Sequence, residues 1–370
     1  MEKSQYRVSD LVYGMGWMSV IMLIVVIGVL FGQAAKVLQT DLADYKIDNF
    51  SSEKVVSQPI DSALPQPTAV SIIFGGDMML GRYVETLMNK NGLNYPFEKL
   101  KPFIEPYDLA VANLEGPITL QHSQTPDYTT SFSFKTEVAT VLKNAGFDVV
   151  SLANNHTADK GLPNLQNTRD VLNGVGILEF GHPLEVQADA VKVKEIGGLK
   201  TVWIGFHDAT VSLDVEAAKK LVAEWQTKMP DATIIVNIHW GAEYIKIANA
   251  KQRDLGRVLV DAGADLIIGH HPHVVQDFEV YNGVPIFYSL GNLVFDQYFS
   301  ADTQLGLMVS VKLMGPSNME LGLWPVSVAK SQPRVLVDAE RTAWLENYAL
   351  SLSEDLRETA KNGSIIVGGL

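Results

Sequence analysis

Three of the eight histidines in this chain, His270, His271 and His273, lie within four residues, directly after the apolar run 266–268. Such a run is typical of a buried strand, and strand ends are where open α/β sheets present side chains to a ligand. A single proline separates His271 from His273, and its stiff backbone allows both imidazoles to face one point. Imidazole nitrogen is a preferred ligand of divalent transition metals, so the spacing predicts a metal site. The alternative interpretation is a solvated turn that contains histidines.

Polar side chains follow the other apolar runs of the chain in the same way. One such junction is commonplace, because Asp and Asn are frequent turn residues and cap the following helix. Six junctions that together offer carboxylates, amides and imidazoles are better explained by a shared site. A mixed nitrogen and oxygen ligand set suits Zn, Mn or Fe better than Ca, which prefers oxygen alone. Besides the histidine cluster, the junctions contain Asp77, Asn113 with Glu115, Asn154 with Asn155 and His156, His239 with Glu243, and Asn292 with Asp296.

Short apolar runs alternate with helical patterns from residue 69 onwards, which is typical of an α/β layered fold. One helical candidate is 251–262, in which Leu255, Val258 and Leu259 share an apolar face. If the sheet is mostly parallel, the carboxyl ends of its strands lie along one edge and all six junctions meet there. The predicted strands cover 70–74, 109–111, 147–152, 202–204, 233–238, 266–268 and 285–288.

The composition limits the classes of partner. The 370 residues carry a formal charge of −13, which argues against nucleic acid because phosphate binding needs a basic face. Hydrophobic residues make up 47% of the chain, enough for a sizeable core. The chain has no cysteine, which excludes disulfides, thiolate metal sites and cysteine nucleophiles.

The N-terminal region predicts a membrane anchor. No charged residue occurs between Gly14 and Ala35, and about 20 apolar residues span a bilayer. The uncharged run exceeds the roughly 7–15 apolar residues of a signal peptide, which favours an uncleaved anchor. Cleavage near Gln33 and a buried helix of a soluble domain are the alternatives. Because the anchor lies so close to the N-terminus, we expect a single-pass protein of the cell membrane whose C-terminal domain is extracytoplasmic.

The chain divides into five predicted parts. Residues 1–13 form a cytoplasmic N-terminus, and 14–35 form the transmembrane anchor. Residues 36–67 are rich in Ser, Asp, Gln and Pro without sustained periodicity, which predicts a flexible linker. The main α/β domain covers 68–335. Residues 336–370 form a helical extension whose last residues fit either an edge strand or a loose end.

In these motifs the chain resembles the CapA family of poly-γ-glutamate capsule biosynthesis, a branch of the calcineurin-like metallophosphoesterase superfamily. The resemblance covers about residues 70–300, and the full ordered set of motifs is specific, although one member such as Gly-Asp is weak. It implies a layered metallophosphoesterase-like sheet sandwich flanked by helices, with one or two divalent ions of Mn, Fe or Zn. The motifs are Gly76-Asp77, Asn113-Leu114-Glu115, Asn155-His156, His239-Trp240-Gly241 with Glu243-Tyr244, Gly269-His270-His271-Pro272-His273, and Ser289-Leu290-Gly291-Asn292 with Asp296-Gln297.

The resemblance also assigns roles by position. Asp77 matches a ligand of one metal, and Glu115 stands where an aspartate usually bridges two metals. His156 matches the histidine that works beside the metals on the leaving group. The remaining matches are ligands: Asn155 is the amide ligand of the second metal, His239 is a further histidine ligand, and His271 and His273 are the closing pair, one for each metal.

One position departs from the superfamily pattern. Asp-x-His is common at the first motif, whereas this chain has Asp77-Met78-Met79. A thioether is a poor ligand for a hard or borderline cation, so one metal position lacks a ligand and a mononuclear site is an alternative. Glu115 in place of aspartate also changes the reach of the carboxylate by one methylene.

Other polar residues of the motifs are candidates for a supporting role. Glu243, Asn292 and Asp296 are candidates for hydrogen-bonding the ligands and so orienting them. His270 is expected to face opposite to His271, and it stays outside the predicted ligand set.

Three hypotheses about function follow from these residues. The first is metal-assisted hydrolysis, in which a bound metal supplies hydroxide near neutral pH and His156 protonates the leaving oxygen. Phosphate esters are the substrate class that the resemblance implies, with an amide or a polymer as alternatives. The second is a non-catalytic scaffold beside other membrane subunits of a capsule polymer machine, which the missing histidine at position 79 favours. A membrane-tethered metal-binding or adhesion module is a third hypothesis.

Because polyglutamate is an anion, contact with this acidic chain requires a local basic or metal-bearing patch.

Overall fold

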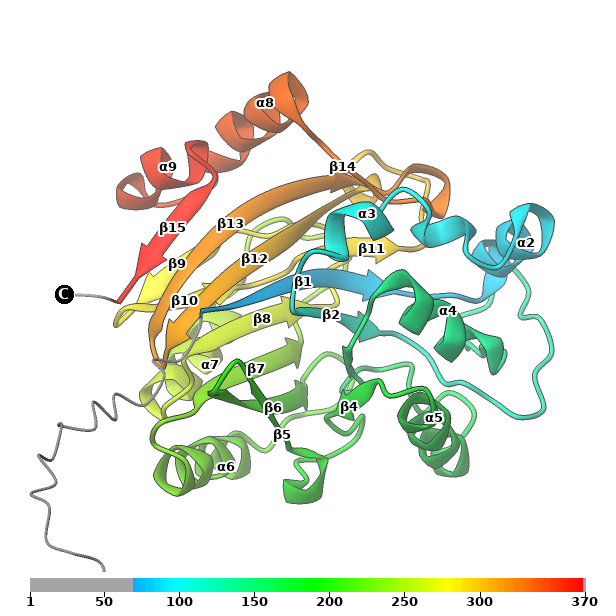
Figure 1. The fold of residues 1–370 in the computed structure, drawn as a ribbon, viewed down its shortest axis with the longest axis horizontal. Helices are drawn as coiled ribbons and strands as arrows, with labels where there is room; N and C mark the ends of the chain where they lie inside the picture. Colours follow the sequence, from blue (N-terminus) through cyan, green and yellow to red (C-terminus); the bar gives the residue numbers. More distant parts are fainter. Residues whose placement is uncertain (1–68, 369–370) are drawn as a thin grey trace, which may run out of the picture. The chain divides into compact units, whose positions relative to one another are not determined.

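The computed structural model describes residues 69–368, which form a sandwich of two β-sheets with helices on both outer sides (Figure 1). This architecture confirms the layered α/β fold expected from the alternation of apolar runs and helical patterns. The predicted membrane anchor at 14–35 and the predicted linker at 36–67 lie outside the described residues. Among residues 69–368, no helix is long and apolar enough to cross a membrane.

The first sheet has nine strands: β1 (Val70–Met78), β2 (Leu109–Leu114), β3 (Val149–Ser151), β4 (Leu178–Phe180), β11 (Asn292–Val294), β12 (Leu305–Gly315), β13 (Asn318–Ser327), β14 (Arg334–Val335) and β15 (Ser364–Val367). Their order is β14-β13-β12-β1-β2-β3-β4, with β11 also paired to β1 and β15 to β13. Strands β1 to β4 run parallel, and β11 pairs parallel with β1. The part built from β12 to β15 is antiparallel.

The second sheet has six strands: β5 (Lys192–Ile196), β6 (Leu199–His207), β7 (Thr233–His239), β8 (Leu266–His270), β9 (Phe278–Tyr281) and β10 (Val284–Phe287). Their order is β5-β6-β7-β8-β10-β9. The four central strands are parallel, and β5 and β9 are antiparallel edge strands.

Eight α-helices and four short 3₁₀ turns occur in the described residues. The 3₁₀ turns cover Tyr95–Phe97, Ala188–Ala190, Asp302–Gln304 and Ala329–Ser331. The helices are α2 (Arg82–Asn91), α3 (Lys101–Ile104), α4 (Glu137–Ala145), α5 (Leu162–Gly174), α6 (Val215–Lys228), α7 (Ala250–Asp261), α8 (Asp338–Ala349) and α9 (Glu354–Lys361).

The seven predicted strands and the predicted helix are all observed. The strands correspond to β1, β2, β3, β6, β7, β8 and β10, and the helix predicted over 251–262 is α7. Helix α7 begins with a capping box in which the side chains of Asn249 and Gln252 each bond the other's backbone N–H. The parallel strands are divided between two sheets, so the polar junctions do not share the edge of a single sheet.

The alternating side chains of β1 explain how the layers are held together. Ile72 and Phe74 point into the core between the two sheets, where the fully buried Trp203 of β6 lies 6.0 Å from Phe74, ring centre to ring centre. Ile73 points the other way, into the core beneath α2, α3, α4 and α5. This period of two is the ordinary consequence of strand geometry. Helices α6 and α7 cover the outer face of the second sheet through a third core.

The C-terminal segment closes one side of the sandwich. Leu345 and Tyr348 of α8 are buried in the core between the sheets. After α9, strand β15 pairs antiparallel with β13, with Ile365 opposite Leu321. The described part of this segment, residues 336–368, therefore contributes two helices and one strand to the fold.

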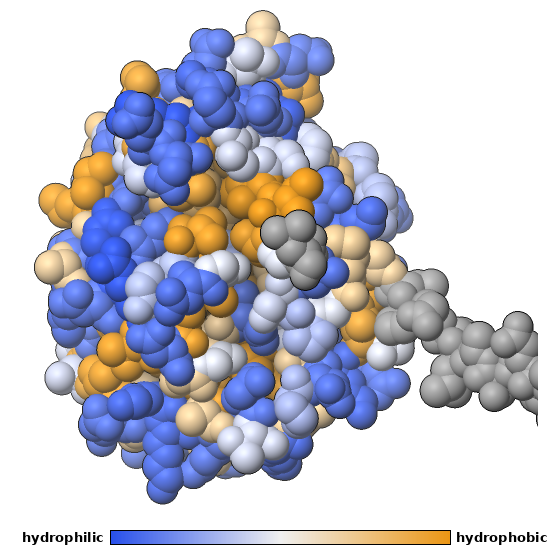
Figure 2. Space-filling model, turned by 90° about the vertical axis from the view of Figure 1, so that its left-hand side faces the viewer, coloured by the Kyte–Doolittle hydropathy of each residue, from blue (hydrophilic) through white to orange (hydrophobic). Residues whose placement is uncertain are grey.

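The parallel strands all point toward one end of the molecule, on the right in Figure 1. The opposite end, where these strands begin, carries a mosaic of hydrophilic and hydrophobic side chains (Figure 2). The predicted ligands follow the carboxyl ends of the parallel strands, so the site lies at the end of the sandwich that Figure 2 does not face.

Gly76, the residue before Asp77 in β1, is expected to tolerate no larger side chain. A Cβ atom at this position would lie 1.9 Å from the carbonyl oxygen of Gly291, because the two backbones are in close contact. We expect Gly76→Ala to lower the free energy of unfolding in urea by about 1–3 kcal/mol or more. Gly174→Ala is the matched control, since nothing lies within 4 Å of a Cβ there and Ala favours a helix by up to about 1 kcal/mol. Equal stability of the two variants would contradict this account of β1.

Candidate metal centre

The polar junctions of both sheets meet in one place. Asp77 and Glu115 come from the ends of β1 and β2 in the first sheet, and His239 and His271 from the ends of β7 and β8 in the second. Both carboxylates are fully buried, and the two histidines are at most 5% exposed. Residues that are far apart in the sequence and belong to different sheets therefore form one cluster.

Two groups of candidate ligand atoms lie within this cluster. Asp77, Glu115 and His239 form a buried group. Glu243, His271 and His273 form a second group, in which Glu243 is exposed. Within each group the candidate atoms lie within 4.8 Å of one another, as they must to share one ion.

Asp77 is held as a charged carboxylate by the groups around it. Its Oδ1 accepts a hydrogen bond from Asn113 Nδ2 at 2.8 Å, and its Oδ2 accepts one from the backbone N–H of His271 at 3.2 Å. Burial alone would raise the pKa of Asp77, but hydrogen bonds from His270 and His273 hold it well below the usual range. Such a carboxylate is ready to bind a cation without first losing a proton.

Unpartnered polar atoms mark the middle of the cluster. Both carboxylate oxygens of Glu115 and Nδ1 of His271 are buried without a hydrogen-bond partner. Burial raises the pKa of Glu115 to about 7 and lowers the pKa of His271 to about 4. Buried polar atoms are normally paired, and a bound cation would satisfy all three of these. The donor set therefore fits a divalent metal.

His273 is oriented by Asn292. Asn292 donates from Nδ2 to the carbonyl oxygen of Thr303 at 3.0 Å, which leaves its Oδ1 to accept a hydrogen bond from His273 Nδ1 at 3.0 Å. The other ring nitrogen, Nε2, then faces Glu115 Oε1 at 3.7 Å and is free to bind a metal. This is the orienting role that the motif predicts for Asn292.

Asn155 and His239 are in direct contact. His239 Nε2 lies 2.8 Å from Asn155 Oδ1, and Nδ1 lies 3.4 Å from Asn113 Nδ2. Burial lowers the pKa of His239 well below its usual range, and neighbouring His271 lowers it further. The imidazole is therefore neutral, which is the form that binds metals.

His156 lies beside the cluster rather than within it. Its Nε2 is 3.9 Å from Glu115 Oε1, and its Nδ1 is 2.9 Å from Asp159 Oδ2. The ring of Phe132 stacks on the imidazole with 4.0 Å between ring centres. Asp159 was not among the predicted site residues, although its spacing of three residues from His156 on the same loop is a signal that could have identified it.

Comparison with known proteins identifies the family. Residues 71–297 match the family model of the bacterial capsule synthesis protein PGA_cap. The chain belongs to this family. It is 33% identical to the PGA biosynthesis protein CapA of Bacillus subtilis in an alignment of 280 positions that covers 71% of this chain and 73% of that protein. It is 32% identical to the capsule biosynthesis protein CapA of Bacillus anthracis in an alignment of 284 positions that covers 71% of this chain and 69% of that protein.

Solved structures resemble this PGA_cap chain only distantly. The crystal structure of a hypothetical protein from Thermus thermophilus aligns with a TM-score of 0.42 at 16% identity, covering 72% of this chain and 99% of that one. The family assignment therefore rests on the sequence matches, which confirm the resemblance found in the motifs.

The side chain of His270 lies in the site, next to Asp77. The prediction that it faces away from the site is wrong: it is 1% exposed, and its Nδ1 lies 3.2 Å from Asp77 Oδ1. Its Nε2 accepts a hydrogen bond from Asn237 Nδ2 at 3.2 Å, which leaves the ring proton on Nδ1, toward Asp77. The strand alternation on which the prediction relied ends at His270, because His271 adopts a left-handed backbone with a φ of 96°.

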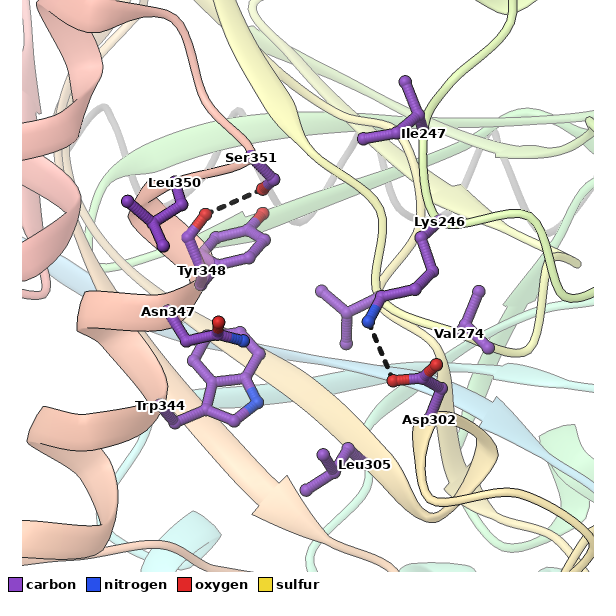
Figure 3. A pocket seen from close by; sticks show the side chains of 11 residues that line it. Lys246, Ile247, Val274, Asp302, Leu305, Trp344, Asn347, Tyr348, Leu350 and Ser351 are labelled. Carbon is purple, nitrogen blue, oxygen red and sulfur yellow. Dashed lines mark hydrogen bonds and ion pairs between the residues drawn. The ribbon is translucent and has the colours of Figure 1, made fainter.

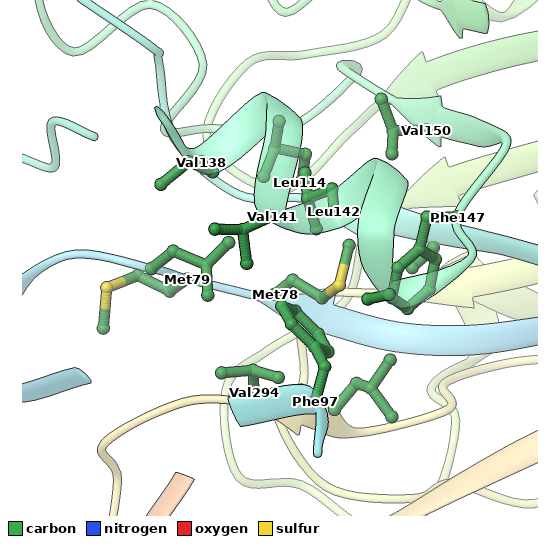
Figure 4. Packing of buried hydrophobic residues seen from close by; sticks show 14 of the residues in the cluster. Met78, Met79, Phe97, Leu114, Val138, Val141, Leu142, Phe147, Val150 and Val294 are labelled. Carbon is green, nitrogen blue, oxygen red and sulfur yellow. The ribbon is translucent and has the colours of Figure 1, made fainter. Parts of the chain in front are cut away.

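Met79 supplies no ligand to the site. Its side chain is fully buried in the core beneath α2 and α4, among residues such as Val138 and Val141 (Figure 4). Its sulfur accepts a hydrogen bond from the backbone N–H of Gly81 at 3.1 Å. The chain therefore differs from the Asp-x-His motif in two ways. Position 79 carries a thioether in place of an imidazole, and this side chain points into an apolar layer.

Asp296 was expected to hydrogen-bond a metal ligand, but its partner is Arg82. It forms a two-pronged ion pair with Arg82, whose guanidinium lies over the rings of Phe132 and Phe295. These rings contact His156 and His273 respectively. Asp296 thus supports the aromatic wall of the site and contacts no candidate ligand.

A cavity of about 340 Å³ lies beside the loop that carries Glu243. Lys246 and Asp302 form an ion pair of 2.8 Å in its wall (Figure 3). None of the candidate metal ligands lines it, so the cavity is distinct from the metal cluster. Its lining residues are Lys246, Ile247, Val274, Val275, Asp302, Leu305, Trp344, Asn347, Tyr348, Leu350 and Ser351.

Proposed function

We propose that this protein is a membrane-anchored, extracytoplasmic component of poly-γ-glutamate capsule biosynthesis or export that carries a metal-dependent hydrolase site of the phosphoesterase type. Membership of the PGA_cap family and the relatives named for capsule and PGA biosynthesis support the biological setting. The observation that carries the catalytic part is Glu115. Its buried and unpartnered carboxylate belongs to the inner group of candidate ligands, and its Oε1 lies 3.7 Å from Nε2 of His273 in the second group.

The ligand set proposed is Asp77, Glu115, Asn155, His239, His271 and His273. A metal ion bound by such groups lowers the pKa of its water to about 7 and polarises the scissile bond. The protein supplies three of these ligands in deprotonated form, because burial keeps His239 and His271 neutral and hydrogen bonds keep Asp77 charged.

His156 is the proposed general acid. Because Nδ1 is hydrogen-bonded to Asp159, the ring is held with Nε2 toward the cluster, and Nε2 can pass a proton to a leaving oxygen. Phe132 fixes the plane of the ring by stacking. Phosphate esters are the proposed substrate class, and the amide bonds of a polymer are the alternative.

The proposed partners are the membrane, other membrane subunits of capsule synthesis, and an anionic polymer or phosphoester. The membrane proposal depends on the uncharged segment 14–35. The polymer proposal needs a cationic patch in a chain with a net charge of −13, and bound divalent ions would supply one.

A second candidate function is a non-catalytic scaffold of the capsule machine. The observation that favours it is Met79, which leaves the first motif without a histidine ligand. Cells in which Asp77 and His271 are replaced by alanine distinguish the two functions. Normal polymer output would favour the scaffold, whereas loss of output with intact folding would favour the hydrolase.

The first experiment is elemental analysis of the purified full chain after mild dialysis, followed by hydrolysis assays on a phosphodiester and a phosphomonoester. We expect about one or two transition-metal ions per chain and metal-dependent turnover. Folded protein that takes up no Mn, Fe or Zn would exclude the hydrolase proposal.

Metal binding is expected to strengthen as the pH rises from about 6.5 to about 8.5. Burial alone would lower the pKa of His273, but the Glu115 carboxylate and the hydrogen bond to Asp77 outweigh it and raise the pKa to about 9. An ion that binds Nε2 of His273 must therefore displace a proton, and protons compete better at low pH. Calorimetric titration with Mn²⁺ in two buffers of different ionisation enthalpy measures this proton release. An affinity independent of pH would contradict the prediction.

A further inference from the structure

We infer that Glu243 is a metal ligand, and that together with His271 and His273 it forms a solvent-facing metal position beside the buried one. This inference rests on the proposed metal-dependent site and names a ligand outside the predicted set. Candidate ligand atoms of these three residues lie within 4.8 Å of one another. Two imidazoles and one carboxylate are a common ligand set for Zn and for non-haem Fe, and such a set leaves coordination positions open.

The backbone joins Glu243 to the two histidines. Tyr244, the next residue, donates its backbone N–H to the carbonyl oxygen of Pro272 at 2.8 Å, and Pro272 lies between His271 and His273. Gln276 donates from Nε2 to the carbonyl oxygen of Ile245 at 2.7 Å, which ties the same loop down a second time. The carboxylate is therefore carried by a loop that is fastened to the segment bearing the other two ligands.

Backbone strain occurs on both sides of this junction. Tyr244 has a φ of 64°, and His271 and His273 have φ values of 96° and 57°. Non-glycine residues rarely adopt such angles, and they are found mostly where the surrounding structure enforces a functional geometry. Here two of the strained residues, His271 and His273, carry the imidazoles. The third, Tyr244, directly follows Glu243, which carries the carboxylate.

The atoms of this group are available for coordination. His271 Nδ1 is buried and has no hydrogen-bond partner, and Nε2 of His273 is the nitrogen left free by the bond to Asn292. The Glu243 carboxylate contacts the hydroxyl of Tyr244, but it forms no ion pair with any Lys or Arg of residues 69–368. Met79 cannot contribute, because it points into the apolar core.

The two positions differ in their access to water. Asp77, Glu115 and His239 are at most 1% exposed, whereas Glu243 is exposed. An ion at the outer position is therefore the one that exchanges with solvent and can take a water molecule or a substrate oxygen. The inner ion is expected to survive dialysis longer than the outer one.

The test compares Mn²⁺ binding to the full chain and to the Glu243→Gln variant, measured by elemental analysis after dialysis and by the electron paramagnetic resonance of bound Mn²⁺. Glutamine keeps the shape of the side chain and removes its charge. We expect Glu243→Gln to lose one of about two ions, or to bind the weaker ion at least about 10-fold less tightly, with an unchanged melting temperature in the absence of metal. Glu105→Gln is the matched control, since Glu105 is an exposed glutamate at the end of α3.

Each outcome decides the inference. If the wild-type chain binds two ions and Glu243→Gln binds both as tightly as Glu105→Gln does, Glu243 is not a ligand, and the hydrolase proposal stands without it. If the wild-type chain binds only one ion in excess Mn²⁺, before the dialysis that would remove an outer ion, loss of that ion in Glu243→Gln supports the inference and its retention overturns it. If the wild-type chain binds no ion, both the inference and the proposed hydrolase fail.

Discussion

Asp77→Asn is expected to lower the affinity for the inner metal ion by at least about 100-fold and to reduce hydrolysis in proportion. The carboxylate accepts hydrogen bonds from Asn113 and from the backbone of His271, and it faces His270. An amide of the same shape has no charge to offer the ion, and its NH₂ group would meet these donors. This loss is larger than the roughly 10- to 100-fold cost of removing an outer hydrogen-bonding partner of a metal ligand.

The measurement for Asp77→Asn is metal content per chain together with the melting temperature without metal. Asp231→Asn is the control, because Asp231 is exposed and lies before the amino-terminal end of β7, whereas the site lies at its carboxyl end. If Asp77→Asn retains the same metal content as Asp231→Asn, Asp77 does not hold the ion and the inner position is assigned wrongly.

His156→Ala is expected to lower turnover of a phosphodiester by about 10²- to 10⁴-fold without changing metal content. The imidazole contacts the cluster only through Nε2, at 3.9 Å from Glu115, so its removal takes away a proton donor and no predicted ligand. The loss should be smallest for substrates with acidic leaving groups, because these depart without protonation.

Asp159→Asn separates positioning of the ring from proton transfer. Asparagine still offers an oxygen that accepts the hydrogen bond from Nδ1, which keeps Nε2 in place, but it removes the carboxylate charge beside the ring, so we expect a smaller loss of turnover than in His156→Ala. His182→Ala is the control, since His182 lies in a loop and belongs to neither group of candidate ligands, so this variant should retain full turnover. Unchanged turnover of His156→Ala on a substrate that the wild-type chain hydrolyses would remove His156 from the mechanism.

Much of the site could be predicted because its residues follow apolar strands directly. Asp77, Glu115 and His239 each come at or just after the end of a run whose hydrophobicity marks a buried strand, and all three lie in the cluster. Strand periodicity is a local property, so the sequence shows where each strand ends. The motif order indicated the family, and the match to the PGA_cap model confirms it.

Two residues, His270, which was left outside the ligand set, and Glu243, which was named only as a supporting residue, have positions that depend on the path of a loop. His270 turns toward Asp77 because the backbone leaves the strand at His271, and no pattern of hydrophobicity encodes a left-handed residue. Glu243 joins His271 and His273 because the backbone of Tyr244 bonds to Pro272. Such contacts join segments that are distant in sequence, and they form only when both loops are in place.

The sequence by itself determined the candidate ligand residues, the strands that end in them, the layered α/β fold and the family. These follow from local periodicity and from motifs that are contiguous in the chain. Only the tertiary structure decided that the strand ends belong to two sheets, that Met79 turns into the core, and that Glu243 reaches the histidines. The physical reason is that sheet pairing and loop approach are fixed by contacts between segments separated by many residues, which no local pattern encodes.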